Sequence, residues 1–341
     1  MNVSMPTTPP GRALPRRGFL LSAAGAATAL VAGCSNSSAK TAATAAPKQG
    51  FPVTIPGKLG PTKVANAPAR VVACGYLRDT DLALALGANL VGFGRNSTFP
   101  TGLAPWQKAS SQAKGFDTVN GLPLTTIDRL RPDLILASDD YGLAKDWATL
   151  GKIAPTLGYL KGVGEDSWQQ MATRAGAALG KKDKAAALVT EVEQKIATVK
   201  SRHPEFAGKT FTFGPVEGNG QIFTTSSATD ASATFFRQLG FTLAPAVTQL
   251  PASATPGRSE ISMERLDLLD ADVLILAYQT TAAQKKLEAN PLFKRLKAVE
   301  RGSYIPLDFP TAIALAFPSV LSIPFGLDAT VPKLATAVAK S

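Results

Sequence analysis

Histidine and cysteine are almost absent from this 341-residue sequence. The only histidine is His203, and the only cysteines are Cys34 and Cys74. Zinc and manganese sites need clusters of histidine, cysteine and carboxylate side chains, so direct capture of these metals is not expected. The sequence also offers no Ser-His-Asp set and no Cys-His pair for nucleophilic catalysis. We therefore expect neither a metal centre, nor a cofactor, nor an enzyme.

Long hydrophobic runs are also missing beyond the N-terminal region, and aromatic residues make up only 7% of the chain. Because the lysines are spread rather than grouped, no nucleic-acid-binding module is expected. The net charge is nevertheless +11. A surplus of this size suits an acidic ligand or an anionic membrane surface, or serves solubility alone.

Residues 1–33 have the organisation of an export signal. A basic segment with three arginines precedes a short alanine-rich apolar run at 18–33, which is too short for a stable membrane anchor. The sequence Pro-Arg-Arg-Gly-Phe-Leu-Leu at 15–21 resembles the twin-arginine export motif. We expect residues 1–33 to be a twin-arginine signal peptide.

Cys34 ends the sequence Val-Ala-Gly-Cys, which resembles a bacterial lipobox. We expect Cys34 to carry a lipid that anchors the protein to the outer face of the cytoplasmic membrane. Residues 34–50 lack periodicity and predict a flexible tether. Cys74 then has no disulfide partner and is expected to be a small buried side chain.

The longest uninterrupted helical pattern runs from Lys181 to His203. Apolar residues recur at helical spacing, Lys and Glu fill the other face, and Pro204 disfavours further helix. A helix of this length spans about 34 Å, roughly the diameter of a small domain. We predict that residues 181–204 form a helix connecting two lobes.

Short apolar strands alternate with helices on both sides of this segment, which predicts an α/β fold with an N-terminal lobe at 51–180 and a C-terminal lobe at 205–341. Residues 125–137 align without a gap onto residues 264–276, which favours two similar lobes. An edge hairpin or extended lead-in is expected at 51–69. The predicted helices are 79–86, capped by Asp79 or Thr80 and closed by Gly87, and 231–239, closed by Gly240; the predicted strands are 71–74, 90–93, 134–137, 210–213, 221–224 and 273–277.

Several short motifs follow one another along these lobes. They include Arg-Val-Val-Ala at 70–73, Leu-Arg-Pro-Asp-Leu-Ile at 130–135, Ile-Ala-Pro-Thr at 153–156 and Ser-Ile-Pro-Phe-Gly-Leu-Asp at 322–328. Together they resemble the iron-siderophore class (class III) of substrate-binding proteins of ABC importers. The resemblance implies two α/β lobes joined by a single long helix, a ligand cleft between them, and a ferric siderophore and an ABC permease as partners. We expect a monomer.

Candidate ligand-binding residues follow from the topology, because ligands of parallel sheets meet the loops at the carboxyl ends of the strands. Arginines there would make charge-assisted hydrogen bonds to siderophore oxygens, and aromatic rings would cover the organic shell. We expect a positively lined cleft, with Asp139 and Asp140 as loop and cap residues. The loops supply Tyr76, Arg78, Arg95, Tyr141, Glu217 and Tyr278.

The resemblance refines this set. Tyr141 is similar to a tyrosine that contacts the siderophore in hydroxamate binders, and Phe309 lies where such proteins often place a stacking aromatic ring. Arg258 lies in a predicted loop before a helix expected from Ile261. Hydroxamate binders also have an arginine near residues 119–121, and this sequence has none there.

In the family, one surface glutamate on each lobe docks on the permease. Glu264 matches the C-terminal position, whereas Thr125 occupies the N-terminal one, with Asp128 as a shifted substitute. The resemblance implies a lipoprotein that captures a ferric siderophore and delivers it for iron uptake. The alternatives are a haem or cobalamin binder on the same fold, or an envelope interaction protein that has lost transport.

Overall fold

The computed structural model describes residues 50–255 and 257–341. The chain divides into two units, 1–45 and 46–341, and all described residues belong to the second. The expected signal peptide, Cys34 and all of the expected tether except Gly50 lie outside the described residues. None of the described helices combines the length and the apolarity needed to cross a membrane.

The N-terminal lobe is built on a five-stranded parallel sheet of order β5-β4-β3-β6-β7. Its central strands β3 and β6 are buried along their whole length, because helices cover both faces. Val71 and Ala73 face a core with α1 and α4, whereas Val72 belongs to a second core with α2 and α3. The strands are β3 (Val71–Ala73), β4 (Leu90–Gly94), β5 (Lys114–Phe116), β6 (Leu134–Leu136) and β7 (Thr156–Leu157), and the helices are α1 (Arg78–Leu86), α2 (Leu124–Arg129), α3 (Leu143–Ile153) and α4 (Trp168–Ala178).

Two details of this lobe bear on the sequence predictions. The lead-in forms an antiparallel hairpin of β1 (Val53–Ile55) and β2 (Thr62–Val64), which packs on α4. The predicted cap of α1 is wrong, because the helix begins at Arg78 and both Asp79 and Thr80 lie inside it and are buried. The Asp79 carboxylate instead accepts a hydrogen bond from the backbone N–H of Asp139, at 2.9 Å.

The C-terminal lobe has a mixed six-stranded sheet of order β11-β9-β8-β12-β13, with β10 paired to β8. Strand β12 lies between two parallel neighbours and is buried throughout. Its partners in the sheet are β8 (Thr210–Val216), β9 (Ile222–Thr225), β10 (Thr242–Leu243), β11 (Arg258–Ile261) and β13 (Tyr304–Asp308), with β12 itself at Val273–Tyr278.

Helices cover both faces of this sheet as well. One face packs on α6, α11 and α12, and the other on η2, α8, α9 and α10. The bounds are η1 (Pro204–Phe206), α6 (Ala231–Leu239), α7 (Pro245–Thr248), η2 (Leu266–Leu269), α8 (Thr281–Ala289), α9 (Pro291–Lys294), α10 (Lys297–Glu300), α11 (Phe309–Ala316) and α12 (Ser322–Val338).

The internal alignment and one local prediction can be compared with this lobe. In the internal alignment Leu134 pairs with Val273, and these are the first residues of strands β6 and β12. Each of the two strands follows a short helix. The helix expected from Ile261 is wrong, because residues 258–261 form strand β11, which pairs antiparallel with β9. That pairing joins Arg258 to Thr225, a contact too distant in sequence to be seen in a local pattern.

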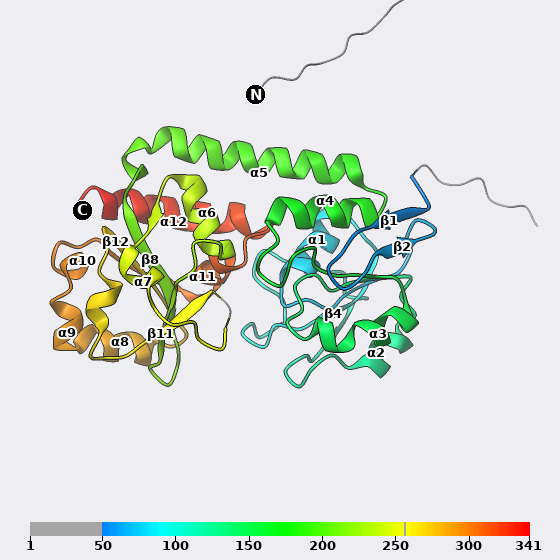
Figure 1. The fold of residues 1–341 in the computed structure, drawn as a ribbon, viewed down its shortest axis with the longest axis horizontal. Coiled ribbons are helices and arrows are strands. Elements are labelled where there is room, and N and C mark those ends of the chain that lie inside the picture. Colours follow the sequence, from blue (N-terminus) through cyan, green and yellow to red (C-terminus); the bar gives the residue numbers. More distant parts are fainter. Residues whose placement is uncertain (1–49, 256) are drawn as a thin grey trace, which may run out of the picture. The chain divides into compact units, whose positions relative to one another are not determined.

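Helix α5 (Lys182–Arg202) runs along both lobes (Figure 1). It packs on α4 of the N-terminal lobe and on α6 and α12 of the C-terminal lobe. The predicted fold class, two α/β lobes joined by a single long helix, is confirmed.

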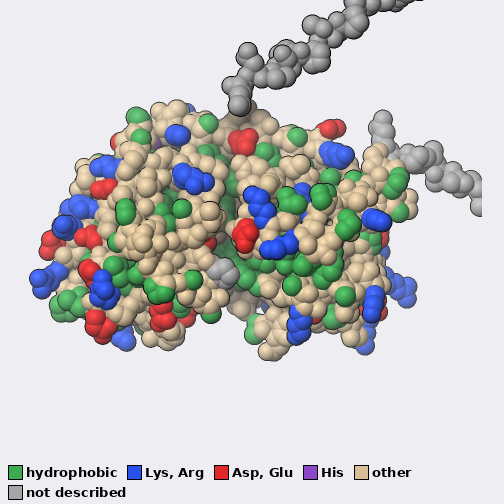
Figure 2. All heavy atoms as spheres, viewed as in Figure 1, with side chains coloured by type: hydrophobic (Ala, Val, Ile, Leu, Met, Phe, Trp, Pro, Cys, Tyr) green, Lys and Arg blue, Asp and Glu red, His purple; other side chains and the backbone are tan. Residues whose placement is uncertain are grey.

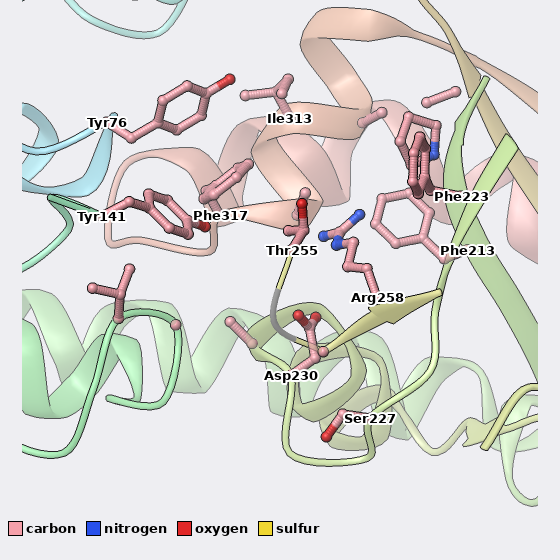
Figure 3. A pocket seen from close by; sticks show the side chains of 18 of the residues that line it. Tyr76, Tyr141, Phe213, Phe223, Ser227, Asp230, Thr255, Arg258, Ile313 and Phe317 are labelled. Atoms are coloured by element: carbon pink, nitrogen blue, oxygen red, sulfur yellow. The ribbon is translucent and has the colours of Figure 1, made fainter. Parts of the chain in front are cut away.

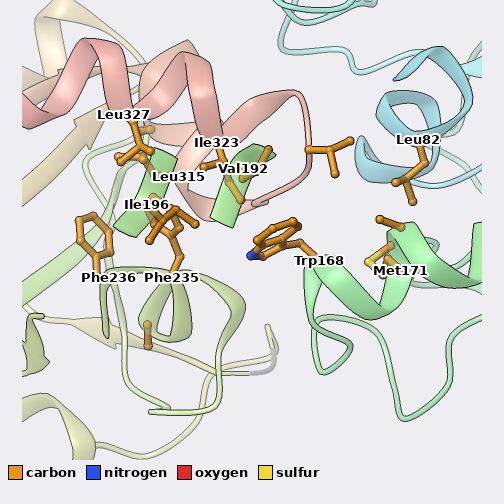
Figure 4. Close-up of a cluster of buried hydrophobic side chains, with 14 of the residues drawn as sticks. Leu82, Trp168, Met171, Val192, Ile196, Phe235, Phe236, Leu315, Ile323 and Leu327 are labelled. Carbon is orange, nitrogen blue, oxygen red and sulfur yellow. The ribbon is translucent and has the colours of Figure 1, made fainter. Parts of the chain in front are cut away.

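The lobes share more than this helix. A single apolar core extends beneath α5 from one lobe to the other (Figure 4). In it Trp168 of α4 lies near Val192 of α5, and Ile196 continues the core toward Ile323 and Leu327 of α12. Burying each of these large side chains contributes about 1.5–3 kcal/mol.

A polar contact also joins the lobes. The buried carboxylate of Asp81 on α1 accepts hydrogen bonds from Ser319 Oγ of the C-terminal lobe at 2.5 Å, from Gln107 Nε2 at 2.7 Å and from Trp106 Nε1 at 3.0 Å. The Trp106 ring in turn packs on Phe325 of α12, with ring centroids 5.0 Å apart. The relative position of the two lobes is therefore fixed by packing and hydrogen bonds as well as by α5.

Candidate ligand-binding site

A cavity of about 440 Å³ lies between the lobes (Figure 3). The N-terminal lobe contributes the loops that follow β3 and β6, together with residues 163–165. The C-terminal lobe contributes side chains of β8, β9, β11 and α11. Because parallel strands end at the same edge of a sheet, loops from distant parts of the sequence meet at this edge.

The N-terminal wall contains a buried ion pair. Arg78 donates through Nε and Nη2 to one oxygen of Asp139, at 2.8 and 2.5 Å, and both side chains are at most 2% exposed. The other Asp139 oxygen accepts the backbone N–H groups of Leu77 and Arg78, each at 3.0 Å. Asp139 thus holds the loop that begins α1. Of the three guanidinium nitrogens of Arg78, only Nη1 has no hydrogen-bond partner among the described residues.

Two tyrosines stand beside this pair on the same wall, Tyr76 and Tyr141. Tyr141 is 53% exposed, yet partial burial, with a further contribution from Asp139, raises its pKa to about 12. It is therefore a neutral phenol at physiological pH and can donate a hydrogen bond.

Four phenylalanines lie on the C-terminal wall. Phe213, Phe223, Phe309 and Phe317 line it, and the Phe317 ring packs on Tyr76 across the lobes with centroids 4.7 Å apart. Arg258, the first residue of β11, projects among these rings (Figure 3). Within residues 50–255 and 257–341 its guanidinium makes no ion pair, so it is available to a ligand.

The cavity lining is not predominantly positive, although the sequence predicted a positively lined cleft. Three carboxylates, Glu165, Glu217 and Asp230, line the cavity together with two guanidiniums, Arg78 and Arg258. The surplus of basic residues lies elsewhere: Figure 2 shows Lys and Arg side chains interspersed with Asp and Glu over the outer surface. The net charge of the chain therefore does not describe its cavity.

Six of the eight predicted site residues line the cavity: Tyr76, Arg78, Tyr141, Glu217, Arg258 and Phe309. Arg95 does not, since its exposed guanidinium lies near the carbonyl of Pro100, at 3.4 Å. Tyr278 does not either, because alternation along β12 turns its side chain to the far face of the sheet. There its hydroxyl hydrogen-bonds that of Tyr304 at 2.6 Å, while Ala277 faces the cavity.

The family follows from comparison with known proteins. A family model described as periplasmic binding protein matches residues 72–311, most of the chain. This chain belongs to the periplasmic binding protein family. It is accordingly a non-enzymatic component of transport with the class III periplasmic binding protein fold.

Solved structures agree with this assignment. A periplasmic solute binding protein from Mycobacterium smegmatis str. MC2 155 is 29% identical, with a TM-score of 0.73 over 84% of this chain and 98% of that one. PiaA from Streptococcus pneumoniae TIGR4, in complex with ferrichrome, is 25% identical, with a TM-score of 0.70 over 85% and 99%. Staphylococcus aureus SirA, complexed with staphyloferrin B, shares the fold at 22% identity, with a TM-score of 0.70 over 83% and 98%. A comparison with curated proteins gives no match.

Sequence reasoning missed several residues lining the cavity of this periplasmic binding protein. Phe213 and Phe223 lie on strands and Phe317 follows a helix, whereas only loops at strand ends were searched. The period of two along β8 was a usable signal, because Phe213 and Pro215 share the face that meets the cavity. Asp230, the N-cap of α6, had no comparable signal.

The predicted docking residues lie on the surface of this periplasmic binding protein. Thr125 is exposed on α2, as is Asp128, and Glu264 is exposed in the turn between β11 and η2. A hydrogen bond from the Ser262 hydroxyl lowers the pKa of Glu264, which keeps its carboxylate charged.

Proposed function

We propose that this protein captures a ferric siderophore in the cavity between its lobes and delivers it to an ABC permease for iron uptake. The observation that carries the proposal is the cavity itself, about 440 Å³ in volume, walled by six aromatic rings and entered by the guanidinium of Arg258. A ferric siderophore presents electronegative oxygens around the metal and an organic shell around them. Arg258 and the tyrosine hydroxyls can donate to the oxygens, while the rings pack on the shell.

The same proposal includes export and anchoring. The motifs around Arg16, Arg17 and Cys34 favour a lipoprotein on the outer face of the cytoplasmic membrane, where a captured ligand can pass to a permease. Replacing Cys34 by Ala would then release the protein from the membrane and abolish incorporation of labelled palmitate. Labelling that persists in the Cys34→Ala protein contradicts this part of the proposal.

Haem is the second candidate because a cavity with aromatic walls also suits a porphyrin. Haem iron takes a histidine, cysteine, methionine or tyrosine ligand from the protein. No histidine lines the described cavity: His203 lies at the end of α5, where it stacks on Phe206 and bonds Glu205 at 2.8 Å. Of the side chains that line the described cavity, only those of Tyr76 and Tyr141 could ligate haem iron, whereas Arg258 and both tyrosines can donate to chelate oxygens, so the siderophore is the better supported ligand.

Titration of the purified protein with ferric siderophores, haem and cobalamin tests the proposal. Trp106 belongs to the apolar cluster of Phe309 and Phe317, so its fluorescence should respond to an occupied cavity. We expect Arg258→Ala and Tyr141→Ala each to raise the Kd for a bound siderophore about tenfold or more, since a hydrogen bond to a charged group contributes about 1.5–3 kcal/mol.

Arg95→Ala is the matched control, because Arg95 is an exposed arginine outside the cavity, and its Kd should be unchanged. Affinities no tighter than about millimolar for every siderophore defeat the proposal. If haem alone binds tightly, haem replaces the siderophore as the proposed ligand.

Thr125 at a docking position favours one further possibility, an envelope protein that keeps the ligand site but no longer serves transport. A deletion strain distinguishes the two. Loss of siderophore-dependent iron uptake supports the transport function, and unchanged uptake with an altered cell wall supports the envelope role.

A further inference from the structure

The charge of the cavity restricts which ligands it can hold. Of the two guanidiniums in the lining, Arg78 is committed to Asp139 through two short hydrogen bonds within a buried pair. Turning Arg78 toward a ligand would leave the fully buried Asp139 carboxylate without its partner, which is strongly destabilising. Among the described contacts only Nη1 of Arg78 has no partner, and this atom is itself buried, so Arg78 is not a free cation for a ligand.

Arg258 is the other cation of the described lining, and its guanidinium forms no ion pair with the described residues. Three acidic residues line the same space: the exposed Glu165 of the N-terminal lobe, and the partly buried Glu217 and Asp230 of the C-terminal lobe. Asp230 is also held in place, because it caps α6 by accepting from the backbone N–H of Ser232 at 2.8 Å. The carboxylates therefore outnumber the available guanidinium on the walls that a ligand would touch.

Ferric siderophores differ in charge in a way that this arrangement can distinguish. Three hydroxamates are each monoanionic and leave the ferric complex neutral, and a free amine elsewhere on the molecule makes it cationic. Three catecholates are each dianionic and leave a trianion. In a cavity with low-dielectric aromatic walls, the repulsion between such a trianion and nearby carboxylates is stronger than in bulk water.

We propose that the cavity selects neutral or cationic ferric chelates of the tris-hydroxamate type and rejects trianionic tris-catecholates. This inference rests on the proposed function and assigns the ligand class of the same site. Arg258 and the hydroxyls of Tyr76 and Tyr141 donate to hydroxamate oxygens, which carry partial negative charge in a neutral complex. Glu165, Glu217 and Asp230 accept from amide N–H groups of the shell or pair with an ammonium group.

The positive charge of the whole chain does not oppose this selection. Charges on the outer surface are screened over about 8–10 Å at physiological ionic strength, whereas charges lining a partly enclosed cavity are screened much less. The surplus of basic residues can raise the rate at which an anion approaches, but the lining decides what stays bound.

The test compares gallium and ferric complexes of three chelators by fluorescence and calorimetry: ferrichrome as the neutral probe, ferrioxamine B as the cationic probe and a tris-catecholate as the trianionic probe. We expect the two hydroxamates to bind at least about a hundredfold more tightly than the tris-catecholate. We also expect the Kd of ferrichrome to change little between low and high salt.

Removing carboxylates from the cavity wall should shift the ligand preference away from the cationic chelate and toward the trianionic one. The double variant Glu165→Gln with Glu217→Gln is expected to weaken the binding of ferrioxamine B at least about threefold relative to that of ferrichrome. It is also expected to improve binding of the tris-catecholate. Glu191→Gln, the same substitution at an exposed position of α5, is the control and should leave all three affinities unchanged.

The outcomes separate this inference from the proposed function. If the tris-catecholate binds as tightly as the hydroxamates or more tightly, the charge selection is wrong while siderophore capture stands. If the double variant shifts no preference, the carboxylates do not set the selectivity and the inference is likewise overturned. If none of the three probes binds, the charge selection is wrong, and the wider siderophore titration decides whether the proposed function also fails.

Discussion

Two buried aspartates near the cleft have opposite electrostatic surroundings. Asp139 faces the guanidinium of Arg78 and two backbone N–H groups. Asp81 has only neutral donors, from Ser319, Gln107 and Trp106. Burial therefore raises the pKa of Asp81 to about 7, although its hydrogen bonds act in the other direction. The pKa of Asp81, which joins the two lobes, thus lies near neutral pH.

This difference predicts a pH dependence of stability. Because the pKa of Asp81 is higher in the folded protein than the ordinary value of 3.8, the folded state binds this proton more tightly than the unfolded chain. The stabilisation is complete below about pH 4 and is lost as the pH rises to about 7. Asp81→Asn should therefore reduce the fall in the free energy of unfolding across this interval, by up to about 1.4 kcal/mol per pH unit.

Urea denaturation between pH 4 and 8 measures this slope. Asp79, whose pKa is also raised to about 7 by burial and by Asp139, contributes in the same direction and remains in the variant. Asp183→Asn, at an exposed position on α5, is the control and should keep the wild-type slope. An unchanged slope in Asp81→Asn contradicts the prediction.

At the scale of elements, α5 is stabilised mainly by what it touches. Only Ala185, Val192 and Ile196 of its residues are buried, and they contact elements of both lobes. Leu188, Val189 and Val199 are partly buried against the same core, whereas Glu191 is exposed, so a substitution at Glu191 interrupts the helix without removing a packed side chain.

Glu191→Pro tests the contribution of this helix. Proline removes one backbone hydrogen bond and clashes with the preceding turn, which should lower the free energy of unfolding by about 3 kcal/mol or more. Glu191→Ala should change it by a few tenths of a kcal/mol at most. Chemical denaturation measures the free energy of unfolding of both variants. Equal values would show that α5 does not need to be continuous.

The elements also show what could be predicted from the sequence. The long helix and strand β12 follow from local apolar patterns, and Gly87 and Gly240 end helices in the left-handed conformation, at φ of 70° and 110°. Strand β11 and the environment of Asp79 depend on partners far away in sequence, Thr225 and Asp139, so no local pattern reveals them. The site divides in the same way: loop residues such as Tyr141 were found, whereas Phe223, on a strand, was not.

At the scale of the whole molecule, the proposed transport function requires a permease to recognise surfaces of both lobes. Glu264 presents a charged carboxylate on one lobe, and Thr125 presents an uncharged side chain on the other. If both positions face the permease, docking is unequal between the lobes.

This inequality predicts opposite effects of two substitutions on transport. Glu264→Ala should reduce siderophore-dependent iron uptake several-fold, and Thr125→Glu should preserve or increase it, while the Kd of the isolated protein stays the same for both. Glu300→Ala, at another exposed position of the C-terminal lobe, is the control and should not affect uptake. Normal uptake by the Glu264→Ala protein would show that docking uses other residues.

The continuous core beneath α5 has a consequence for how the chain is made. Helix α12 is the last helix of the sequence, yet its Ile323 and Leu327 belong to the same core as Trp168 and Val192. A nascent chain therefore cannot complete the packing beneath α5 until α12 has left the ribosome. Premature termination near residue 320 removes apolar contacts from the region that the lobes share, so its damage is not confined to the missing end.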